Sequence, residues 1–324
     1  MSNRIRRLGG RWLAPLSSLT VLAILWWKSN ASFEDLGPQL ARADLKILAG
    51  TLVFSAFWHT VLGADKWWRI LRAMGAQVSF WEVFRVRMGS DPIRIAVPMK
   101  GGEVVNVAYF ARLESFGFGR AAGSVVFDKA LNFFGEVFWL YIGIAAMAKF
   151  PTPGYIVLHS AIGAAVFLLF CVRPARQLGV ATATLLHPKL GRLATGVLSA
   201  FEEFSWWQKV GFLSYGAVFQ IRPLAVCGLV LLAFDPVRPP TLPELLVLGS
   251  VVVLVSNLPS MAGVGPREAA LMAMFAGFAD QATLLSVGLL MSLIVQVLPA
   301  ALGIPFMFPL LRELTVRAGP PASP

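Results

Sequence analysis

Charged residues are scarce in this sequence: Asp, Glu, Lys and Arg make up 14% of 324 residues, whereas hydrophobic residues make up 57%. A soluble globule cannot bury so many apolar side chains, so the composition excludes a soluble protein and predicts a polytopic membrane protein. Acidic residues are the rarer charges, with 17 Asp and Glu against 28 Lys and Arg. Because the basic residues gather between apolar segments, we interpret them as signals of membrane orientation and expect no nucleic-acid partner.

Cysteine and histidine are also rare, with two and three residues respectively. Cys171 and Cys227 have no cysteine or histidine at metal-ligand spacing, so they are expected to be packing residues. His59 lies in an apolar segment and is expected to be a hydrogen-bonded core residue. Gly101 and Gly102 do not form a nucleotide-binding loop, because no Gly-Lys-Ser/Thr follows them. We therefore expect neither a metal ion nor a cofactor.

Long uncharged runs alternate with clusters of basic residues along the chain. An uncleaved membrane anchor, rather than a cleaved signal peptide, is expected at residues 13–27, after an arginine-rich start. The basic loop at 66–94, the basic residues at 173–192 and both chain ends are expected to be cytoplasmic. Further spans are expected at residues 47–64, 120–148, 155–172, 210–234 and 281–311.

Residues 257–268 interrupt an uncharged, apolar region. Proline removes a backbone donor and glycine permits positive φ, so this stretch should end one helix and begin another. Arg267 and Glu268 would lie in the first turn of the second helix, where the helix dipole favours Glu268. Irregular backbone at membrane depth persists only where protein or a water-filled cavity covers it. The residues that break the helix here are Pro259, Gly263, Gly265 and Pro266.

A second broken segment, residues 92–111, repeats this order of proline, two glycines and glutamate. Two Gly/Pro-interrupted segments in corresponding halves point to the midplane site of a transporter. We predict one all-α membrane domain over 1–324, with halves 1–150 and 151–311 and a cytoplasmic tail 312–324. It would have about six to eight transmembrane helices, and its two opposed re-entrant segments would form a pseudo-inverted repeat. The second set of breaks is Pro98, Gly101 and Gly102.

The span expected at 120–148 carries three polar residues at a spacing of four: Asp128, Asn132 and Glu136. This spacing places them on one helical face, which in a membrane should face a cavity. Arg222 lies inside another span, directly before a proline. It is either a site residue or the partner of an acidic neighbour such as Glu136.

The motifs of both broken segments resemble those of a known family. The first reads Val-Pro-Met-Lys-Gly-Gly-Glu at 97–103 and is followed by Arg112 and by Asp128-Lys129. The second reads Leu-Pro-Ser-Met-Ala-Gly-Val-Gly-Pro-Arg-Glu at 258–268. From about residue 45 onward the chain is similar to the flippase-like integral membrane proteins that include the membrane region of bacterial lysylphosphatidylglycerol synthases. It departs from their pattern at Asp91, where many members carry asparagine, and at Lys129, where arginine is common.

This resemblance implies a bacterial inner-membrane lipid transporter without the soluble synthase domain, and membrane lipids as its partners. Arginine and lysine would hold an anionic headgroup, while carboxylates would serve as counter-ions, amine partners or proton carriers. The lipid (phospholipid, hopanoid or polyprenyl-linked sugar) and the oligomeric state stay open. Charges in membranes are costly, so Glu103 and Arg267 are expected to approach one another.

Three alternatives stand beside transport. The protein could be a membrane-embedded lipid-modifying transferase that uses the same carboxylates as acid and base. It could be a non-transporting partner of envelope-lipid biosynthesis enzymes, and its charges could be ion pairs that only lock the broken helices. No nucleophile–base pair can be recognised in the sequence, which favours transport over a transferase. The predicted binding and translocation residues are Lys100, Glu103, Arg112, Asp128, Lys129, Asn132, Glu136, Arg222, Asn257, Arg267 and Glu268.

Overall fold

The computed structural model describes residues 41–97, 102–113, 116–147, 172–188, 204–257 and 264–316, with a few isolated positions elsewhere. Within these ranges the protein consists of helices and the turns between them, and they contain no strand. The expected all-α class is therefore confirmed. The anchor expected at 13–27 and the span expected at 155–172 lie outside the described residues, apart from single positions.

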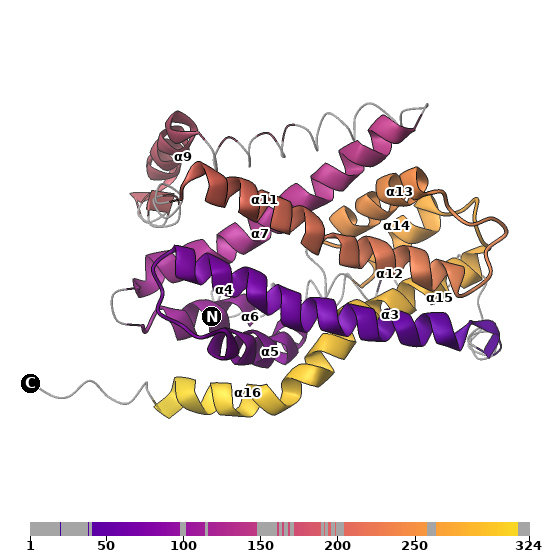
Figure 1. Ribbon diagram of the computed structural model, residues 1–324, viewed down its shortest axis with the longest axis horizontal. Coiled ribbons are helices and arrows are strands. Elements are labelled where there is room, and N and C mark those ends of the chain that lie inside the picture. Colours follow the sequence, from indigo (N-terminus) through magenta and orange to yellow (C-terminus); the bar gives the residue numbers. More distant parts are fainter. Residues whose placement is uncertain are drawn as a thin grey trace, which may run out of the picture.

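Three long helical rods cross the structure (Figure 1). The first consists of α3 (Leu45–Phe57), the π turn η1 (Trp58–Leu62) and α4 (Gly63–Ala73). The second joins α11 (Trp206–Phe219) to α12 (Ile221–Leu232). The third joins α15 (Gln281–Ser292) through the π turn η2 (Leu293–Val297) to α16 (Leu298–Val316). By length and composition all three could cross a membrane, as expected for the spans at 47–64, 210–234 and 281–311.

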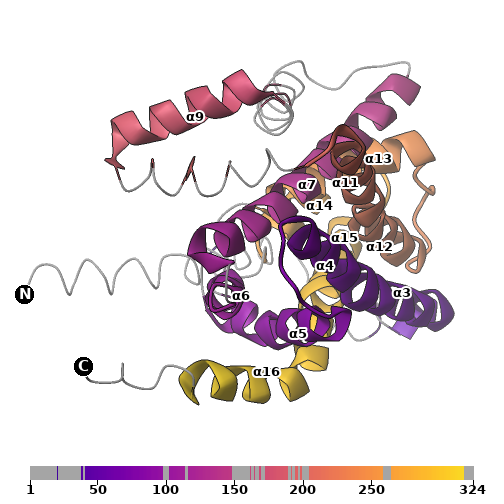
Figure 2. The same cartoon turned by 60° about the vertical axis from the view of Figure 1, so that its left-hand side comes forward.

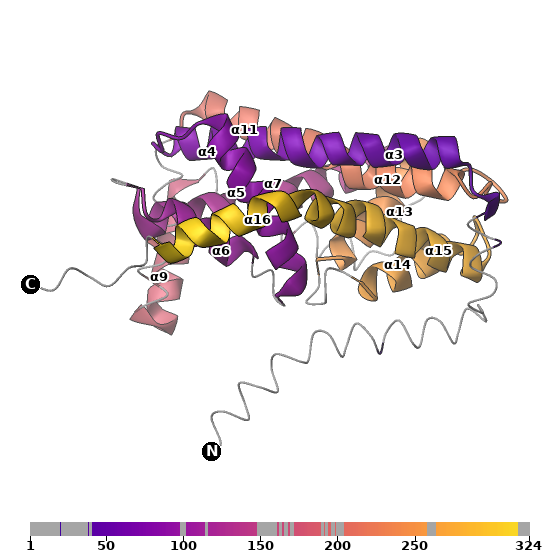
Figure 3. The ribbon, with the colours of Figure 1, turned by 90° about the horizontal axis from the view of Figure 1, so that it is seen from below.

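Each rod is interrupted along its length. The first and third rods contain the π turns, and such turns are frequent at functional sites. In the second rod Gln220 separates α11 from α12, and Pro223 follows in the first turn of α12, where its missing donor is tolerated. The first rod runs alongside α12 (Figure 3), so the interruptions of these two rods lie near each other.

Helix α7 (Gly117–Ala146) runs diagonally across the structure (Figure 1) and packs against α11. The two helices approach closely at Gly135 and Gly216. A Cβ at Gly135 would lie 2.4 Å from the Gly216 carbonyl oxygen, and a Cβ at Gly216 would lie 2.6 Å from the Leu131 carbonyl oxygen. Small residues allow this approach between membrane helices, so the glycine pair sets the position of α7.

The structure contains two helical hairpins, and each of them ends in a short helix. In the first, α5 (Phe80–Ala96) precedes α6 (Gly102–Phe110); in the second, α13 (Leu242–Val255) precedes α14 (Pro266–Met274). With nine residues each, or about 14 Å, α6 and α14 are too short to cross a hydrocarbon core of about 30 Å. In both places one helix ends and a second begins, as expected, while most of the residues predicted to break the helix lie outside the described ranges. The number of crossings and the inverted relation between the hairpins remain predictions.

The apolar core has two principal parts. The first lies among α4, α5, α6 and the start of α7, where the ring centroids of Trp67 and Phe110 are 5.0 Å apart. The second lies among α12, α14 and α15 and includes the fully buried Phe275. Each hairpin therefore belongs to a different part of the core. The remaining described helix, α9 (Arg173–Leu186), extends away from both (Figure 2).

The expectation of a basic cytoplasmic loop at 66–94 was wrong in its structure. This region forms most of α4 and all but the end of α5, and only residues 74–79 connect the two helices. Lys66 is fully buried and Arg87 is nearly so. The positive-inside rule counts charges along the chain and cannot tell a loop charge from one that helix packing buries.

We predict that Gly216→Ala lowers the stability of the protein. The added methyl group would meet the backbone of α7, and overpacking of this kind costs about 1–3 kcal/mol. Gly211→Ala is the matched control, because Gly211 lies in the same helix and a Cβ added there would have no atom within 4 Å. The melting temperature of the detergent-solubilised variants measures the effect, and equal melting temperatures for the two variants would contradict the helix contact.

Candidate functional site

The most deeply buried charge pair joins the first rod to α7. The side chain of Lys66 is 0% exposed, and its Nζ lies 2.8 Å from Oδ1 of Asp128. Lys66 also donates a hydrogen bond to Oδ1 of Asn132 and lies 4.2 Å from the centroid of the Phe219 ring. Asp128 and Asn132 belong to the polar face predicted for this helix, so that face does meet polar partners.

From Asp128 a chain of charges leads into the first hairpin. Nζ of Lys129 lies 3.8 Å from Oδ2 of Asp128 and 2.7 Å from Oε1 of Glu103. Oε1 of Glu103 in turn lies 3.5 Å from Nε of Arg94, and NH1 of Arg94 lies 2.9 Å from Oδ1 of Asp91. Glu103 therefore links α6 to α5 through Arg94 and to α7 through Lys129.

The chain of charges ends in the π turn η1. Nε2 of His59 lies 2.8 Å from Oδ2 of Asp91, and both side chains are buried. The expectation of a hydrogen-bonded core histidine is confirmed. Its partner, however, is a carboxylate that also pairs with Arg94, so His59 belongs to the buried charge network.

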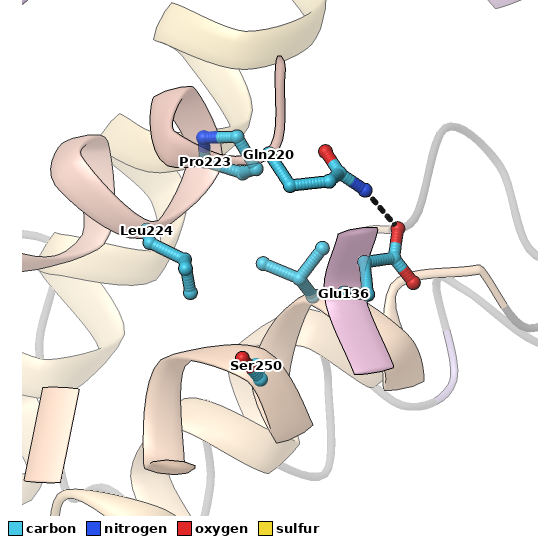
Figure 4. A pocket seen from close by; sticks show the side chains of 6 residues that line it. Glu136, Gln220, Pro223, Leu224 and Ser250 are labelled. Carbon is cyan, nitrogen blue, oxygen red and sulfur yellow. Dashed lines mark hydrogen bonds between the residues drawn. The ribbon is translucent and has the colours of Figure 1, made fainter. Parts of the chain in front are cut away.

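A polar cluster centred on Glu136 joins α7 to the second rod and the second hairpin. Nε2 of Gln220 donates to Oε1 of Glu136 at 2.5 Å (Figure 4), and Nδ2 of Asn257 donates to both Glu136 oxygens at 3.1 and 3.2 Å. Beside these groups is a narrow pocket, which Ser250 also lines and which has no room for a water molecule. A carboxylate with amide partners therefore stands beside the interruption of the second rod.

The start of α14 forms a separate polar group. Gly265 adopts φ 96°, a left-handed conformation that favours glycine, and its N–H donates to Oε2 of Glu268 at 2.6 Å. Ser292 donates to Oε1 of Glu268 at 2.6 Å and accepts from NH1 of Arg267 at 2.9 Å, while Nε of Arg267 donates to Ser256 at 3.2 Å. Arg267 and Glu268 thus lie in the first turn of α14, as expected, and are bridged by a hydroxyl.

Two buried arginines lack a partner among the described residues. Arg87 and Arg222 are each only 6% exposed, and neither forms an ion pair there. Nε of Arg87 and both Nε and NH1 of Arg222 have no hydrogen-bond acceptor. The guanidinium of Arg87 lies against Gly63, where a Cβ would come within 3.0 Å of it. Unpaired charges inside a membrane protein are costly, so these two arginines are the strongest candidates for contact with an anionic ligand.

The arginines lie within electrostatic range of one another. Arg222 interacts with Arg87, Arg94 and Arg267 as like charges and with Asp91 as an opposite charge. The buried carboxylates, in contrast, all have donors or cations beside them. The charge that is left without a counter-ion in this region is therefore positive.

Most predicted site residues occupy this region, but the expected approach of Glu103 to Arg267 was wrong, because Glu103 pairs with Lys129 and Arg94. Of the two alternatives for Arg222, the described residues do not show the pair with Glu136. Arg112 is exposed and donates to the Leu314 carbonyl oxygen at 3.0 Å, without a described contact to the charge network. The predicted residues that lie outside the described ranges are Lys100, Pro98, Gly101, Pro259 and Gly263.

Sequence reasoning missed several members of the network. Lys66 and Arg87 fall within the loop expected at 66–94, and His59 is expected to be a hydrogen-bonded core residue rather than a member of a charged site. A usable signal was the position of Lys66 just after the uncharged run 47–64 and Asp65, where a helix can carry the lysine into the membrane. The missed residues that the structure places in the charge network or beside it are His59, Lys66, Arg87, Asp91, Arg94 and Gln220.

Comparison with known proteins gives one match. The sequence model of a protein family described as the lysylphosphatidylglycerol synthase TM region matches residues 14–303. No curated protein and no solved structure matches the chain. The match covers the first two long rods, both hairpins and every residue of the charge network. It ends at Gly303, so most of α16 in the third rod lies beyond it.

We predict that Lys66→Met destabilises the protein, because it leaves Asp128 buried beside only the more distant Lys129. Breaking a buried pair in this way costs about 3–5 kcal/mol. In the double variant Lys66→Met/Asp128→Leu no charge is stranded, so much of the loss should be recovered. The free energy of unfolding in mixed detergent micelles measures both effects.

The control for the Lys66 and Asp128 variants is Arg69→Ala, which breaks an exposed ion pair. Arg69 pairs with Asp65 on the same helix, but its side chain is 57% exposed, so its removal should cost less than about 1 kcal/mol. A double variant that is as unstable as Lys66→Met would show that the pair is not the source of the effect.

Proposed function

Since the chain belongs to the lysylphosphatidylglycerol synthase TM-region family, we propose that it moves an anionic or amphipathic lipid between bilayer leaflets. Membership of this family places the chain among multi-pass membrane proteins that handle lipids. The proposal adds that the headgroup crosses through the polar region between the two hairpins while the acyl chains stay in the bilayer. It also places the protein in the bacterial inner membrane with both chain ends cytoplasmic.

The observation that carries the proposal is the pair of buried arginines without counter-ions, Arg87 and Arg222. A lipid phosphate would supply the missing negative charge. Arginine suits this role because its planar fork can bind two phosphate oxygens at once. Arg87 comes from the first hairpin and Arg222 from the second rod, so a phosphate held by both would link the two parts of the core.

Transport also requires that the headgroup enter and leave. The pocket at Glu136 has no room even for a water molecule, whereas ligand sites usually hold roughly 300–1,000 Å³. We therefore infer that this conformation is closed and that a hairpin moves to admit the lipid. The left-handed turn at Gly265 and the interruption at Gln220 are suitable hinges, since short irregular segments absorb changes of φ and ψ.

Reconstitution into liposomes tests this function. Fluorescent phospholipids in the inner leaflet become accessible to a membrane-impermeant quencher only if the protein moves them outward. A lipid transporter changes the leaflet of the label and leaves its covalent structure intact. Appearance of a new lipid species would instead support the transferase, and neither result would favour a non-transporting partner of biosynthetic enzymes.

We predict that Arg222→Gln abolishes lipid movement while the protein remains folded. Glutamine removes an unpaired charge, so membrane abundance should be equal to or above that of the wild type. Arg222→Lys keeps the charge but loses the fork and should recover part of the activity. Arg238→Gln is the control, because Arg238 lies in an exposed turn. Wild-type flux through stable Arg222→Gln protein would exclude a headgroup contact at this position.

We predict a different result for Arg267, which donates to two serine hydroxyls beside Glu268. If Arg267 also contacts the headgroup, Arg267→Ala abolishes transport in a normally folded protein, and Arg267→Lys restores part of it. If Arg267 only holds α14 in place, its alanine variant is poorly expressed and the surviving protein transports normally. Lipid flux and membrane abundance, measured on the same preparation, distinguish these outcomes.

A further inference from the structure

His59 is a buried titratable group that the proposed lipid path does not use. Its ring lies in the π turn η1, where Nε2 contacts Oδ2 of Asp91 at 2.8 Å. The other oxygen of Asp91 pairs with Arg94, so Asp91 is a carboxylate and accepts the proton of Nε2. Because Nε2 then carries the hydrogen, Nδ1 is the nitrogen that remains able to bind a further proton.

The π turn that carries His59 is attached to the second rod near Arg222. Nε1 of Trp58, the residue before His59, donates to the Phe219 carbonyl oxygen at 3.2 Å. At the other end of the turn, the hydroxyl of Tyr215 donates to the Leu62 carbonyl oxygen at 3.3 Å. Movement at the α11–α12 interruption would therefore be transmitted to the turn that holds His59.

The charges around His59 depend on whether an anion is present. Burial of the ring opposes a positive charge on it most strongly, and Asp91 favours one. Arg222 and Arg87 lie within electrostatic range of the ring and add a smaller opposition. Arg94 neutralises part of the Asp91 charge, and Arg267 lies further along the same arginine group. An anion bound to Arg87 and Arg222 would remove the opposing charge at the moment of binding.

We propose that His59 is a proton-binding site coupled to the anion site at Arg87 and Arg222, so that the chain carries an anionic lipid together with a proton. The proposal rests on the proposed function for its lipid, but its two sites are defined by the buried side chains. Water supplies the proton to Nδ1 of His59 on one side of the membrane and receives it on the other. One phosphodiester and one proton move together, and the net charge moved is zero.

Coupling between two sites is reciprocal. If the anion favours the proton on His59, the proton must favour the anion by the same factor. Wherever binding takes up a whole proton, the Kd of the anion rises tenfold for each unit increase in pH. A phosphodiester headgroup does not titrate between pH 5 and 8, so a pH dependence in that range belongs to the protein.

Binding of dihexanoyl-phosphatidylglycerol to the full chain in phosphatidylcholine nanodiscs tests this proposal. Calorimetry in buffers with different ionisation enthalpies measures the number of protons taken up per lipid bound. The wild type should take up close to one proton per lipid bound, and its Kd for the lipid should rise with pH. His59→Gln keeps a donor toward Asp91 but cannot titrate, so it should bind without proton uptake and with a flat pH profile.

Two controls accompany this measurement. The His187→Gln variant, changed at the end of α9, should behave as the wild type. Binding of dihexanoyl-phosphatidylcholine, which carries no net charge, should be accompanied by the uptake of fewer protons. Should His59→Gln fail to fold, the ¹⁵N shifts of labelled histidine in the wild type show which of its three histidines is protonated on binding.

Three results would overturn the proposal. These are wild-type binding without proton uptake, unchanged uptake in His59→Gln, and no binding of phosphatidylglycerol at all. Failure of the proposed function gives a different result. In that case, proton-coupled binding persists in nanodiscs although reconstituted liposomes show no lipid movement.

Discussion

The structure depends on one constraint, which is that a charge buried in a membrane protein must have a partner close by. Lys66 and Asp128 satisfy it most completely, since both side chains are buried and their charged atoms lie 2.8 Å apart. A buried carboxylate or ammonium without a partner would cost several kcal/mol, so the position of α7 against the first rod follows from this pair. The glycine contact between α7 and α11 then determines how closely the second rod can approach.

The two hairpins satisfy this constraint in different ways. In the first, Glu103 and Asp91 pair with lysine and arginine through ion pairs. In the second, hydroxyls and a backbone N–H stabilise Arg267 and Glu268. A hydroxyl can accept a hydrogen bond from a cation and donate one to an anion, but it carries no charge of its own. The buried cations that form no ion pair among the described residues are instead Arg87 and Arg222, and these are the physical basis for proposing an anionic ligand.

Irregular backbone gathers around the same region. The π turn η1 carries His59, η2 directly follows Ser292, and Gln220 separates α11 from α12. A regular helix uses its own carbonyl groups internally, whereas an interrupted one leaves some free for contacts such as those of Trp58 and Tyr215. Interruptions in membrane helices are stable only where protein or a water-filled cavity covers them, and both π turns pack against neighbouring helices.

The sequence alone determined the features that depend on composition and local spacing. These are the membrane class, both helix breaks, the start of α14 at Pro266 and the polar face of α7, because helix periodicity and the geometry of glycine and proline act over a few residues. Only the tertiary structure decided which charges meet. Lys66 and Asp128 are more than sixty positions apart, and a positive-inside count assigned Lys66 to a loop. Among the residues that the structure describes, Arg222 forms no ion pair with a carboxylate. Such outcomes depend on how whole helices pack, since a partner within about 4 Å can come from any part of the chain.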